Sequence, residues 1–411
     1  MRFWRFGTLT MVVTMALSSC SFGAPMATLR PSSYSPTAAS STSAGGSVPS
    51  LPPTATPALL ATGGWHSCGV TAAKALKCWG DNEYGQVGDK STRDRTKPAS
   101  VAGLGRAVLS VATGWDHTCA VTQAGAAKCW GNNAFGQLGD GKRTTRVSPV
   151  TVSGLKSGVV SMSAGGWFTC AVTTSGAANC WGINEHGELG DGTTKRRLKP
   201  VVVSGLNSGV VSVAAGWGHT CAVTTSGGVK CWGNNAYGRL GDGTVSRRLK
   251  PVDVVGLGSG VRSVAVGAAH NCALTSGGGV KCWGNNGSGR LGDGSRTNRS
   301  LPVEVVGLGS GVQSISVGWA HSCAVTTVGG VKCWGSNSSG QLGNNTTTAS
   351  STPVDVTGLT SGVYAVVTGS YHSCAFTIAG DIRCWGKNAD GRLGDGTVKD
   401  RSRPVNVKSF A

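Results

Sequence analysis

Paired cysteines carry the most evident chemistry in this chain, because thiolates bind metal ions and can be oxidised to disulfides. Two cysteines ten residues apart recur seven times, and in six copies a histidine stands two residues before the first one. The pairs are Cys68 with Cys78, Cys119 with Cys129, Cys170 with Cys180, Cys221 with Cys231, Cys272 with Cys282, Cys323 with Cys333, and Cys374 with Cys384. The third copy has Phe168 at the histidine position, which argues against a zinc site built from these residues. We therefore expect a disulfide in each copy, with no metal or other cofactor.

The pairs recur at an interval of 51 residues, so the elements that position them must repeat as well. An unvarying interval indicates one supersecondary unit copied in tandem. Runs of Val, Thr and Ala alternate with Gly, Asn and Asp turns, which is typical of strands and hairpins. In the fourth copy, a turn at Ser226–Gly228 would place Cys221 opposite Cys231. Opposed residues on antiparallel strands have Cβ atoms about 4.5–5.5 Å apart, which a disulfide can bridge after modest adjustment.

The composition indicates an all-β protein with a basic surface. The 411 residues include 66 glycines and 14 prolines, and only 13% are charged. Lysine and arginine number 37 against 18 acidic residues, a formal charge of +19. Such an excess points to an acidic partner or surface, although solubility alone is the alternative explanation. Paired cysteines at this density indicate an oxidising compartment.

The N-terminal residues predict export. Residues 1–19 begin with Arg2 and Arg5 and continue as a mostly apolar run, which is typical of a signal peptide. The run ends at Leu17-Ser-Ser-Cys20, which resembles the bacterial lipobox and implies a lipid on Cys20 that anchors the protein to a membrane. Ordinary signal cleavage and secretion is the alternative. Residues 20–57 are rich in Ser, Thr, Ala and Pro and predict a disordered tether in the cell envelope.

A longer motif follows each second cysteine. Cys129–Gly141 reads Cys-Trp-Gly-Asn-Asn-Ala-Phe-Gly-Gln-Leu-Gly-Asp-Gly and resembles the repeat of the regulator of chromosome condensation family, as does Cys384–Thr397 in varied form. The resemblance covers residues 58–411 and implies a seven-bladed β-propeller with four antiparallel strands per blade. Seven repeats agree with this fold, because propellers close with four to eight blades. The paired cysteines resemble those of secreted bacterial members. Nucleotide exchange, light sensing and β-lactamase inhibition all occur in the family, and none follows from the fold alone.

Two further series recur with the repeat. A tryptophan follows each second cysteine, and we interpret this series as core between blades: Trp79, Trp130, Trp181, Trp232, Trp283, Trp334 and Trp385. An aspartate recurs in the Gly-Asp-Gly turn: Asp140, Asp191, Asp242, Asp293 and Asp395. Calcium binding would use such carboxylates, but a turn in which Asp bonds its own backbone explains them better.

The residues that break the repeat are the best guide to a binding site. After the Gly-Asp-Gly turn, the third and fourth copies carry basic side chains, whereas the sixth copy carries no charge there. The basic residues are Lys195, Arg196, Arg197 and Lys199 in the third copy, and Arg247, Arg248 and Lys250 in the fourth. Equivalent loops of a propeller emerge on one face, so these residues predict one basic patch. Chance variation among repeats is the alternative.

Taken together, the sequence predicts a monomeric, exported and lipid-anchored propeller that binds a protein or an anionic envelope polymer through the basic patch. No Ser-His-Asp group, carboxylate pair or phosphate loop stands apart from the repeats, so we expect no enzyme; His186 is the one histidine outside the repeat positions. An envelope enzyme with a site in the central channel and an inhibitor of a secreted enzyme are the alternatives. Nucleic acid is not an expected partner, because most aromatic residues are committed to the core.

Overall fold

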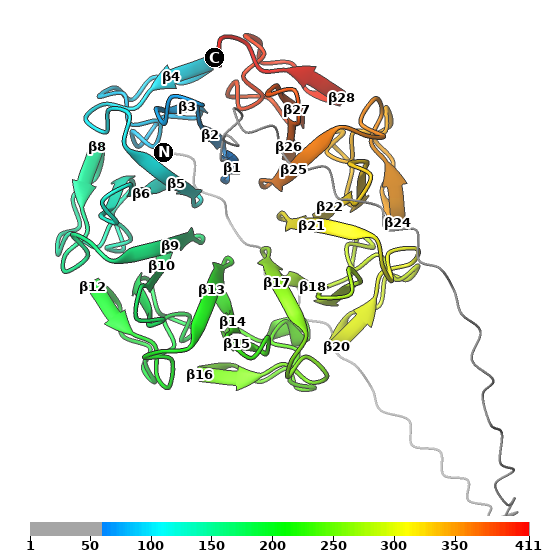
Figure 1. Cartoon of the computed structure of the whole chain (residues 1–411), viewed down its shortest axis with the longest axis horizontal. Helices are drawn as coiled ribbons and strands as arrows, with labels where there is room; N and C mark the ends of the chain where they lie inside the picture. The colour runs from blue at the N-terminus through cyan, green and yellow to red at the C-terminus, as the bar shows by residue number, and fades with distance from the viewer. Residues whose placement is uncertain (1–59, 411) are drawn as a thin grey trace, which may run out of the picture. The chain divides into compact units, whose positions relative to one another are not determined.

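The computed structural model describes residues 60–410, which form seven four-stranded antiparallel sheets arranged as blades around a central channel (Figure 1). The all-β, seven-bladed propeller predicted from the repeats is therefore confirmed. The predicted signal peptide (residues 1–19), the predicted tether (residues 20–57) and Cys20, the predicted site of lipid attachment, lie outside the described residues. No helix in the described part of the chain is long and apolar enough to cross a membrane.

Each blade uses four consecutive strands. Blades 1 to 4 contain β1 (Leu60–Thr62), β2 (His66–Val70), β3 (Leu76–Gly80) and β4 (Arg95–Ser100); β5 (Val108–Thr113), β6 (His117–Thr122), β7 (Ala127–Gly131) and β8 (Arg146–Thr151); β9 (Val159–Ala164), β10 (Phe168–Thr173), β11 (Ala178–Gly182) and β12 (Arg197–Val202); and β13 (Val210–Ala215), β14 (His219–Thr224), β15 (Val229–Gly233) and β16 (Arg248–Asp253). Blades 5 to 7 contain β17 (Val261–Val266), β18 (His270–Thr275), β19 (Val280–Gly284) and β20 (Arg299–Glu304); β21 (Val312–Val317), β22 (His321–Thr326), β23 (Val331–Gly335) and β24 (Ser350–Asp355); and β25 (Val363–Thr368), β26 (His372–Thr377), β27 (Ile382–Gly386) and β28 (Arg401–Asn406). A short 3-10 turn, η1 (Ala236–Gly238), lies in blade 4.

The first strand of each blade lies next to the channel and the fourth lies at the periphery (Figure 1). The first and last described strands belong to different sheets, β1–β4 and β25–β28, so no sheet in residues 60–410 combines the two ends. Contacts between neighbouring blades must therefore close the ring.

The central hairpin of each blade holds its disulfide. In blade 4, β14 and β15 pair so that Cys221 lies directly opposite Cys231, as the turn at Ser226–Gly228 predicts. All seven predicted pairs are joined in this way, with Cα atoms 4.0–4.1 Å apart. The cysteines are at most 1% exposed, so the bonds lie inside the blades. Each bond is local, and none links two blades.

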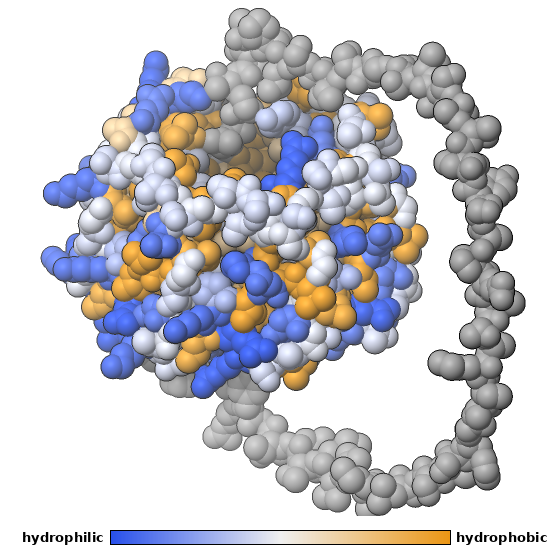
Figure 2. All heavy atoms as spheres, turned by 60° about the horizontal axis from the view of Figure 1, so that its bottom comes forward, coloured by the Kyte–Doolittle hydropathy of each residue, from blue (hydrophilic) through white to orange (hydrophobic). Residues whose placement is uncertain are grey.

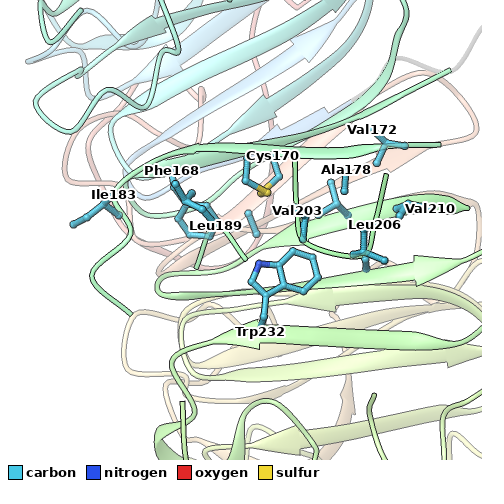
Figure 3. Close-up of a cluster of buried hydrophobic side chains, with 14 residues drawn as sticks. Phe168, Cys170, Val172, Ala178, Ile183, Leu189, Val203, Leu206, Val210 and Trp232 are labelled. Atoms are coloured by element: carbon cyan, nitrogen blue, oxygen red, sulfur yellow. A yellow bond between two sulfur atoms is a disulfide. The ribbon is translucent and has the colours of Figure 1, made fainter. Parts of the chain in front are cut away.

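Tryptophan packs the seams between blades. All seven tryptophans of the repeated series have 0% exposure, which confirms their interpretation as core. Figure 3 shows Trp232 of blade 4 against Leu189, Val203 and Leu206 from the preceding repeat. Its indole Nε1 donates a hydrogen bond to the carbonyl oxygen of Glu188 at 2.9 Å. The indole thus fills the apolar seam and also ties the two blades together.

A buried histidine reinforces six of the seven seams. The hydroxyl of Thr118 in blade 2 donates to the carbonyl oxygen of Gln86 in blade 1, and His66 Nε2 of blade 1 lies 2.8 Å from the same hydroxyl. Because the hydroxyl of Thr118 donates its proton to Gln86, its oxygen can only accept a hydrogen bond from His66. The imidazole proton of His66 must therefore be on Nε2, which donates to this oxygen. At the closing seam His372 contacts Ser67 at 2.9 Å, so the ring closes with the same unit. In blade 3, Phe168 replaces this histidine.

The recurrent aspartate organises the long loop between the third and fourth strands. In blade 3, Asp191 Oδ1 accepts hydrogen bonds from the backbone N–H and the hydroxyl of Thr193, which confirms the predicted turn. Its Oδ2 forms an ion pair with Arg197 at 2.7 Å. Burial alone would raise the pKa of Asp191, but these hydrogen bonds and the guanidinium lower it below its ordinary value. In blade 6 the pair is replaced by two neutral residues, Asn344 and Ser350.

Candidate functional site

The turns between the first and second strands meet at one mouth of the channel, where glycine allows them to approach closely. A Cβ atom added to Gly63 would lie 2.3 Å from the carbonyl oxygen of Gly114 in the next blade, which is too close for any other residue. The equivalent glycines of all seven blades line the same mouth. The two residues after each glycine differ from blade to blade.

Six blades place one aromatic ring at one of these two variable positions. The aromatic cluster consists of Trp65, Trp115, Trp167, Trp217, Trp319 and Tyr371, all of them half-buried. The indoles of Trp217 and Trp319 have centroids 4.1 Å apart, and Trp115 lies 5.0 and 4.9 Å from them. Trp65 extends the cluster with an edge contact to Trp115 at 5.6 Å. One mouth of the channel is therefore capped by aromatic rings.

Blade 5 interrupts the aromatic cluster, because it has Ala268 and Ala269 at both variable positions. A cleft of about 460 Å³ lies beside this gap, walled by the rings of Trp167, Trp217, Tyr237 and Trp319. Arg239 and Arg290 line it as well. Its other polar residues are Asn234, Asn285, Glu185, Glu188 and His186, the histidine that stands outside the repeat positions.

The arginines of the cleft occupy a repeat position that has another role in most blades. Gln86, Gln137, Glu188 and Gln341 stand there in blades 1, 2, 3 and 6, and each accepts a hydrogen bond from the backbone N–H two residues earlier. An arginine side chain has no acceptor for such a bond, so the guanidinium groups of Arg239 and Arg290 donate to other acceptors. Arg239 donates to the carbonyl oxygen of Ala268 at 3.1 Å, and Arg290 to that of Trp319 at 3.3 Å.

Burial shifts the pKa values of the ionisable side chains at this mouth. Burial, together with the positive charge of Arg290, lowers the pKa of Arg239 to about 10. Burial raises the pKa of Glu188 to about 7, and it raises that of Asp116, beside Trp115, to about 7. Cationic donors next to aromatic faces are suited to binding carboxylates and planar groups. Within residues 60–410, no group of three His, Cys, Asp or Glu side chains could hold a metal ion.

The predicted basic patch divides into two kinds of residue. Arg197 and Arg248 form ion pairs with the turn aspartates of their own loops, Asp191 and Asp242, at 2.7 and 2.8 Å. These two arginines hold their loops together. The remaining basic residues are exposed: Lys195, Arg196, Lys199, Arg247 and Lys250.

Arg196 joins the patch to the aromatic cluster. Its guanidinium lies over the ring of Phe135 at 5.1 Å, and Phe135 contacts Trp167 at 5.5 Å. In the view of Figure 2, hydrophilic side chains project around the propeller and hydrophobic residues are scattered between them. The aromatic cluster with its basic edge is therefore the more distinctive candidate surface.

Sequence analysis missed this cluster, although it left a signal. The repeated tryptophans, such as Trp232, drew attention because of their spacing, whereas Trp115, Trp217 and Trp319 stand at positions that change between copies. Only the closed ring shows that these positions converge. Ala268 and Ala269 likewise stand at these variable positions, and only the closed ring shows that the cleft lies beside them.

Comparisons with known proteins agree with the fold. The family model of the RCC1-like domain matches residues 156–411, and models of the regulator of chromosome condensation (RCC1) repeat match residues 78–121, 128–172, 58–86 and 108–137. The ultraviolet-B receptor UVR8 of Arabidopsis thaliana is 32% identical over 360 residues, which cover 86% of this chain and 82% of that protein. The E3 ubiquitin-protein ligase HERC2 of Homo sapiens is 34% identical over 274 residues, 65% of this chain and 6% of that protein.

Solved structures show the same fold. Yeast RCC1 (Prp20), in a structure bound to Kap60, superposes with a TM-score of 0.72 at 22% identity, covering 86% of this chain and 84% of that one. Human WBSCR16 gives a TM-score of 0.72 at 23% identity, covering 81% and 94%. With the matched family models and the identity to UVR8, the chain belongs to the regulator of chromosome condensation repeat family.

Proposed function

We propose that this propeller is an interaction module that binds a partner protein through the aromatic cluster and its basic edge. The observation that carries the proposal is the gathering of six half-buried rings at one mouth of the channel, beside Arg239 and Arg290. Tryptophan, tyrosine and arginine dominate the binding energy of protein interfaces when they are desolvated together. The exposed Arg196 and Arg247 add positive charge, which favours an acidic partner surface.

We also propose that the protein acts outside the cytoplasm. The seven disulfides support an oxidising compartment, since such bonds persist there. The signal-like residues 1–19 and the lipobox-like sequence before Cys20 support export and a lipid anchor, with residues 20–57 as a tether. Secretion without a lipid is the alternative.

Capture of partners from the native cell surface tests the interface, with the full chain as bait. Trp217→Ala should weaken capture of a specific partner roughly tenfold or more, because an interface tryptophan contributes at least about 2 kcal/mol. Blade 5 has Ala268 at the same position, so the fold accepts this change. Val255→Ala is the control, since Val255 is 51% exposed and lies outside the aromatic cluster.

A variant that lacks two exposed arginines distinguishes a protein partner from an anionic envelope polymer. Replacing Arg196 and Arg247 with Gln should mainly reduce the association rate and its salt dependence. Loss of binding in this variant with full binding by Trp217→Ala would assign the contact to the basic residues, as an anionic envelope polymer requires. Equal capture by all variants would remove the aromatic cluster from the interface.

Light absorption is a second candidate function, favoured by one observation. Trp115, Trp217 and Trp319 are in mutual contact with centroids 4.1–5.0 Å apart, and the relative UVR8 is named an ultraviolet-B receptor. Ultraviolet-B irradiation should then change the near-ultraviolet circular dichroism and the partner affinity of the wild type, and Trp217→Phe should abolish both changes. Identical spectra and affinities in light and darkness would exclude this function.

A further inference from the structure

The cleft beside blade 5 is a departure from an otherwise regular arrangement. Each of the other six blades has one ring at the two variable positions, whereas blade 5 has Ala268 and Ala269. The resulting volume of about 460 Å³ is within the range of small-molecule pockets, roughly 300–1,000 Å³. Its walls are the rings of Trp217, Trp319 and Tyr237. The size and the aromatic walls fit a small planar ligand.

Two arginines in this cleft have no carboxylate partner within the described residues. The equivalent residue of blade 7, Arg392, pairs with Asp390 two residues earlier and lies over Trp65 at 4.5 Å. At the position of Asp390, blade 4 has Tyr237 and blade 5 has Ser288, and neither side chain is a carboxylate. Arg239 and Arg290 therefore bring two positive charges to the cleft, and neither forms an ion pair with a carboxylate of the described residues.

This arrangement costs stability in the free protein. Arg239 is only 7% exposed, and both burial and the charge of Arg290 lower its pKa to about 10. Tyr237, whose ring lies 5.8 Å from the Arg239 guanidinium, has a φ of 67°, a conformation that a bulky residue rarely adopts. Unpaired charge and backbone strain together are typical of ligand sites, where a bound group relieves them.

We propose that this cleft binds a small planar aromatic monocarboxylate, with its ring against Trp217 and Trp319 and its carboxylate accepting hydrogen bonds from Arg239 and Arg290. Glu185 and Glu188 line the same cleft, so a second negative group on the ligand is disfavoured. The carboxylate comes either from a free small molecule or from the C-terminus of a peptide ending in an aromatic residue. The ligand site overlaps the proposed partner interface, since Trp217, Arg239 and Arg290 belong to both.

Calorimetric titration of the full chain with 2-naphthoate tests the site. Saturable binding is expected, whereas the neutral 2-naphthamide should bind at least roughly tenfold more weakly, because it cannot form charge-assisted hydrogen bonds with the arginines. The dianion 2,6-naphthalenedicarboxylate should also bind at least roughly tenfold more weakly, because its second carboxylate would enter a cleft that Glu185 and Glu188 line. N-acetyltryptophan and its amide form a further pair that mimics a peptide end. Tighter binding of N-acetyltryptophan than of 2-naphthoate identifies a peptide terminus as the source; the reverse identifies a free acid.

Three variants locate the binding. The double variant in which Gln replaces both Arg239 and Arg290 should bind 2-naphthoate no more tightly than 2-naphthamide. Ala268→Trp should block binding without removing a charge, and the fold accepts a tryptophan at this position in blades 2, 4 and 6. Arg392→Gln is the matched control and should bind as the wild type does. Absence of saturable binding by the wild type, or unchanged binding by Ala268→Trp, would overturn the proposal. Loss of 2-naphthoate with intact partner capture in Ala268→Trp would leave the proposed interface standing.

Discussion

Acidification from about pH 7 to about pH 4 should unfold the propeller, because six histidines at the seams must stay neutral in the folded state. The six have 0% exposure: His66, His117, His219, His270, His321 and His372. Burial lowers the pKa of His66, His117, His219 and His321 to about 3, and it holds that of His270 and His372 well below the ordinary value. In the unfolded chain all six histidines take up a proton near pH 6.5, well above the pH at which they do so in the folded protein.

The sign of the effect follows from these values. Below about pH 6.5 the unfolded state binds more protons than the folded state, so stability falls as the pH falls. Three carboxyls oppose this loss, since burial raises the pKa of Asp81 to about 6 and that of Asp116 and Glu188 to about 7. Between about pH 4.5 and about pH 6, the unfolded state binds about three protons more than the folded state, which lowers stability by roughly 4 kcal/mol per pH unit at about 1.4 kcal/mol per proton. Below the ordinary pKa of a carboxyl group, the three carboxyls are protonated in the unfolded state as well, so they no longer offset the effect of the histidines. The free energy of unfolding then falls more steeply with pH.

Urea unfolding at several pH values measures this dependence, and the chain itself suggests the variant. His117→Phe copies blade 3, where Phe168 occupies the same position. The variant loses the contact of 2.9 Å with Thr169 and should be less stable at neutral pH, but its loss of stability on acidification should be smaller by one proton, about 1.4 kcal/mol per pH unit. His186→Phe is the control, because His186 is exposed. An unchanged slope in His117→Phe would mean that the folded protein accommodates a charged imidazole at the seam.

The features that could be predicted from sequence are those that the chain repeats and that depend on local geometry. A turn at Ser226–Gly228 sets the register of one hairpin, so it also sets the pairing of Cys221 with Cys231. A large aromatic residue such as Trp232 recurs at the same position in every copy. Its burial therefore follows from the packing of one blade on the next. Seven copies then determine the number of blades.

The features that could not be predicted depend on which residues converge across blades. Arg197 and Arg248 were expected in a basic patch because sequence shows a charge but not its partner; the turn brings each guanidinium onto an aspartate six residues earlier. Trp217 and Trp319 are 102 residues apart and meet only because the ring closes. The cleft requires the same closure and also the absence of a ring in blade 5.

Reduction of the seven disulfides should greatly lower the stability of the propeller at neutral pH. Each bond closes a segment with a sequence separation of 10 residues. In the chain-entropy model such a bond contributes about 2–3 kcal/mol, as an upper figure because a hairpin is already partly ordered. Seven such contributions are comparable to the whole stability of a typical domain, about 5–15 kcal/mol. We therefore expect reduced protein to lose its near-ultraviolet circular dichroism in urea concentrations that leave the oxidised protein folded.

The rate of reduction should report on opening of the blades. Because the cysteines are at most 1% exposed, a thiol reagent can reach a disulfide only after its blade has opened. Reduction without denaturant should therefore be slow, and it should accelerate steeply with urea. Alkylation and mass measurement at successive times would count the bonds that remain; fast reduction of all seven in the absence of urea would show that the blades open freely.

Removal of one bond separates the local effect from closure of the ring. Replacing Cys323 and Cys333 with alanine should lower the free energy of unfolding by about 2–3 kcal/mol. Val255→Ala is the control, because Val255 is 51% exposed. The seam between blades 7 and 1 keeps its own contacts, since Trp79 donates to the carbonyl oxygen of Arg392 at 2.9 Å. Unfolding of this variant should consequently remain a single transition at lower urea, because blade 6 still packs on both neighbours. A separate early transition confined to blade 6 would instead show that each disulfide stabilises its own blade independently of the ring.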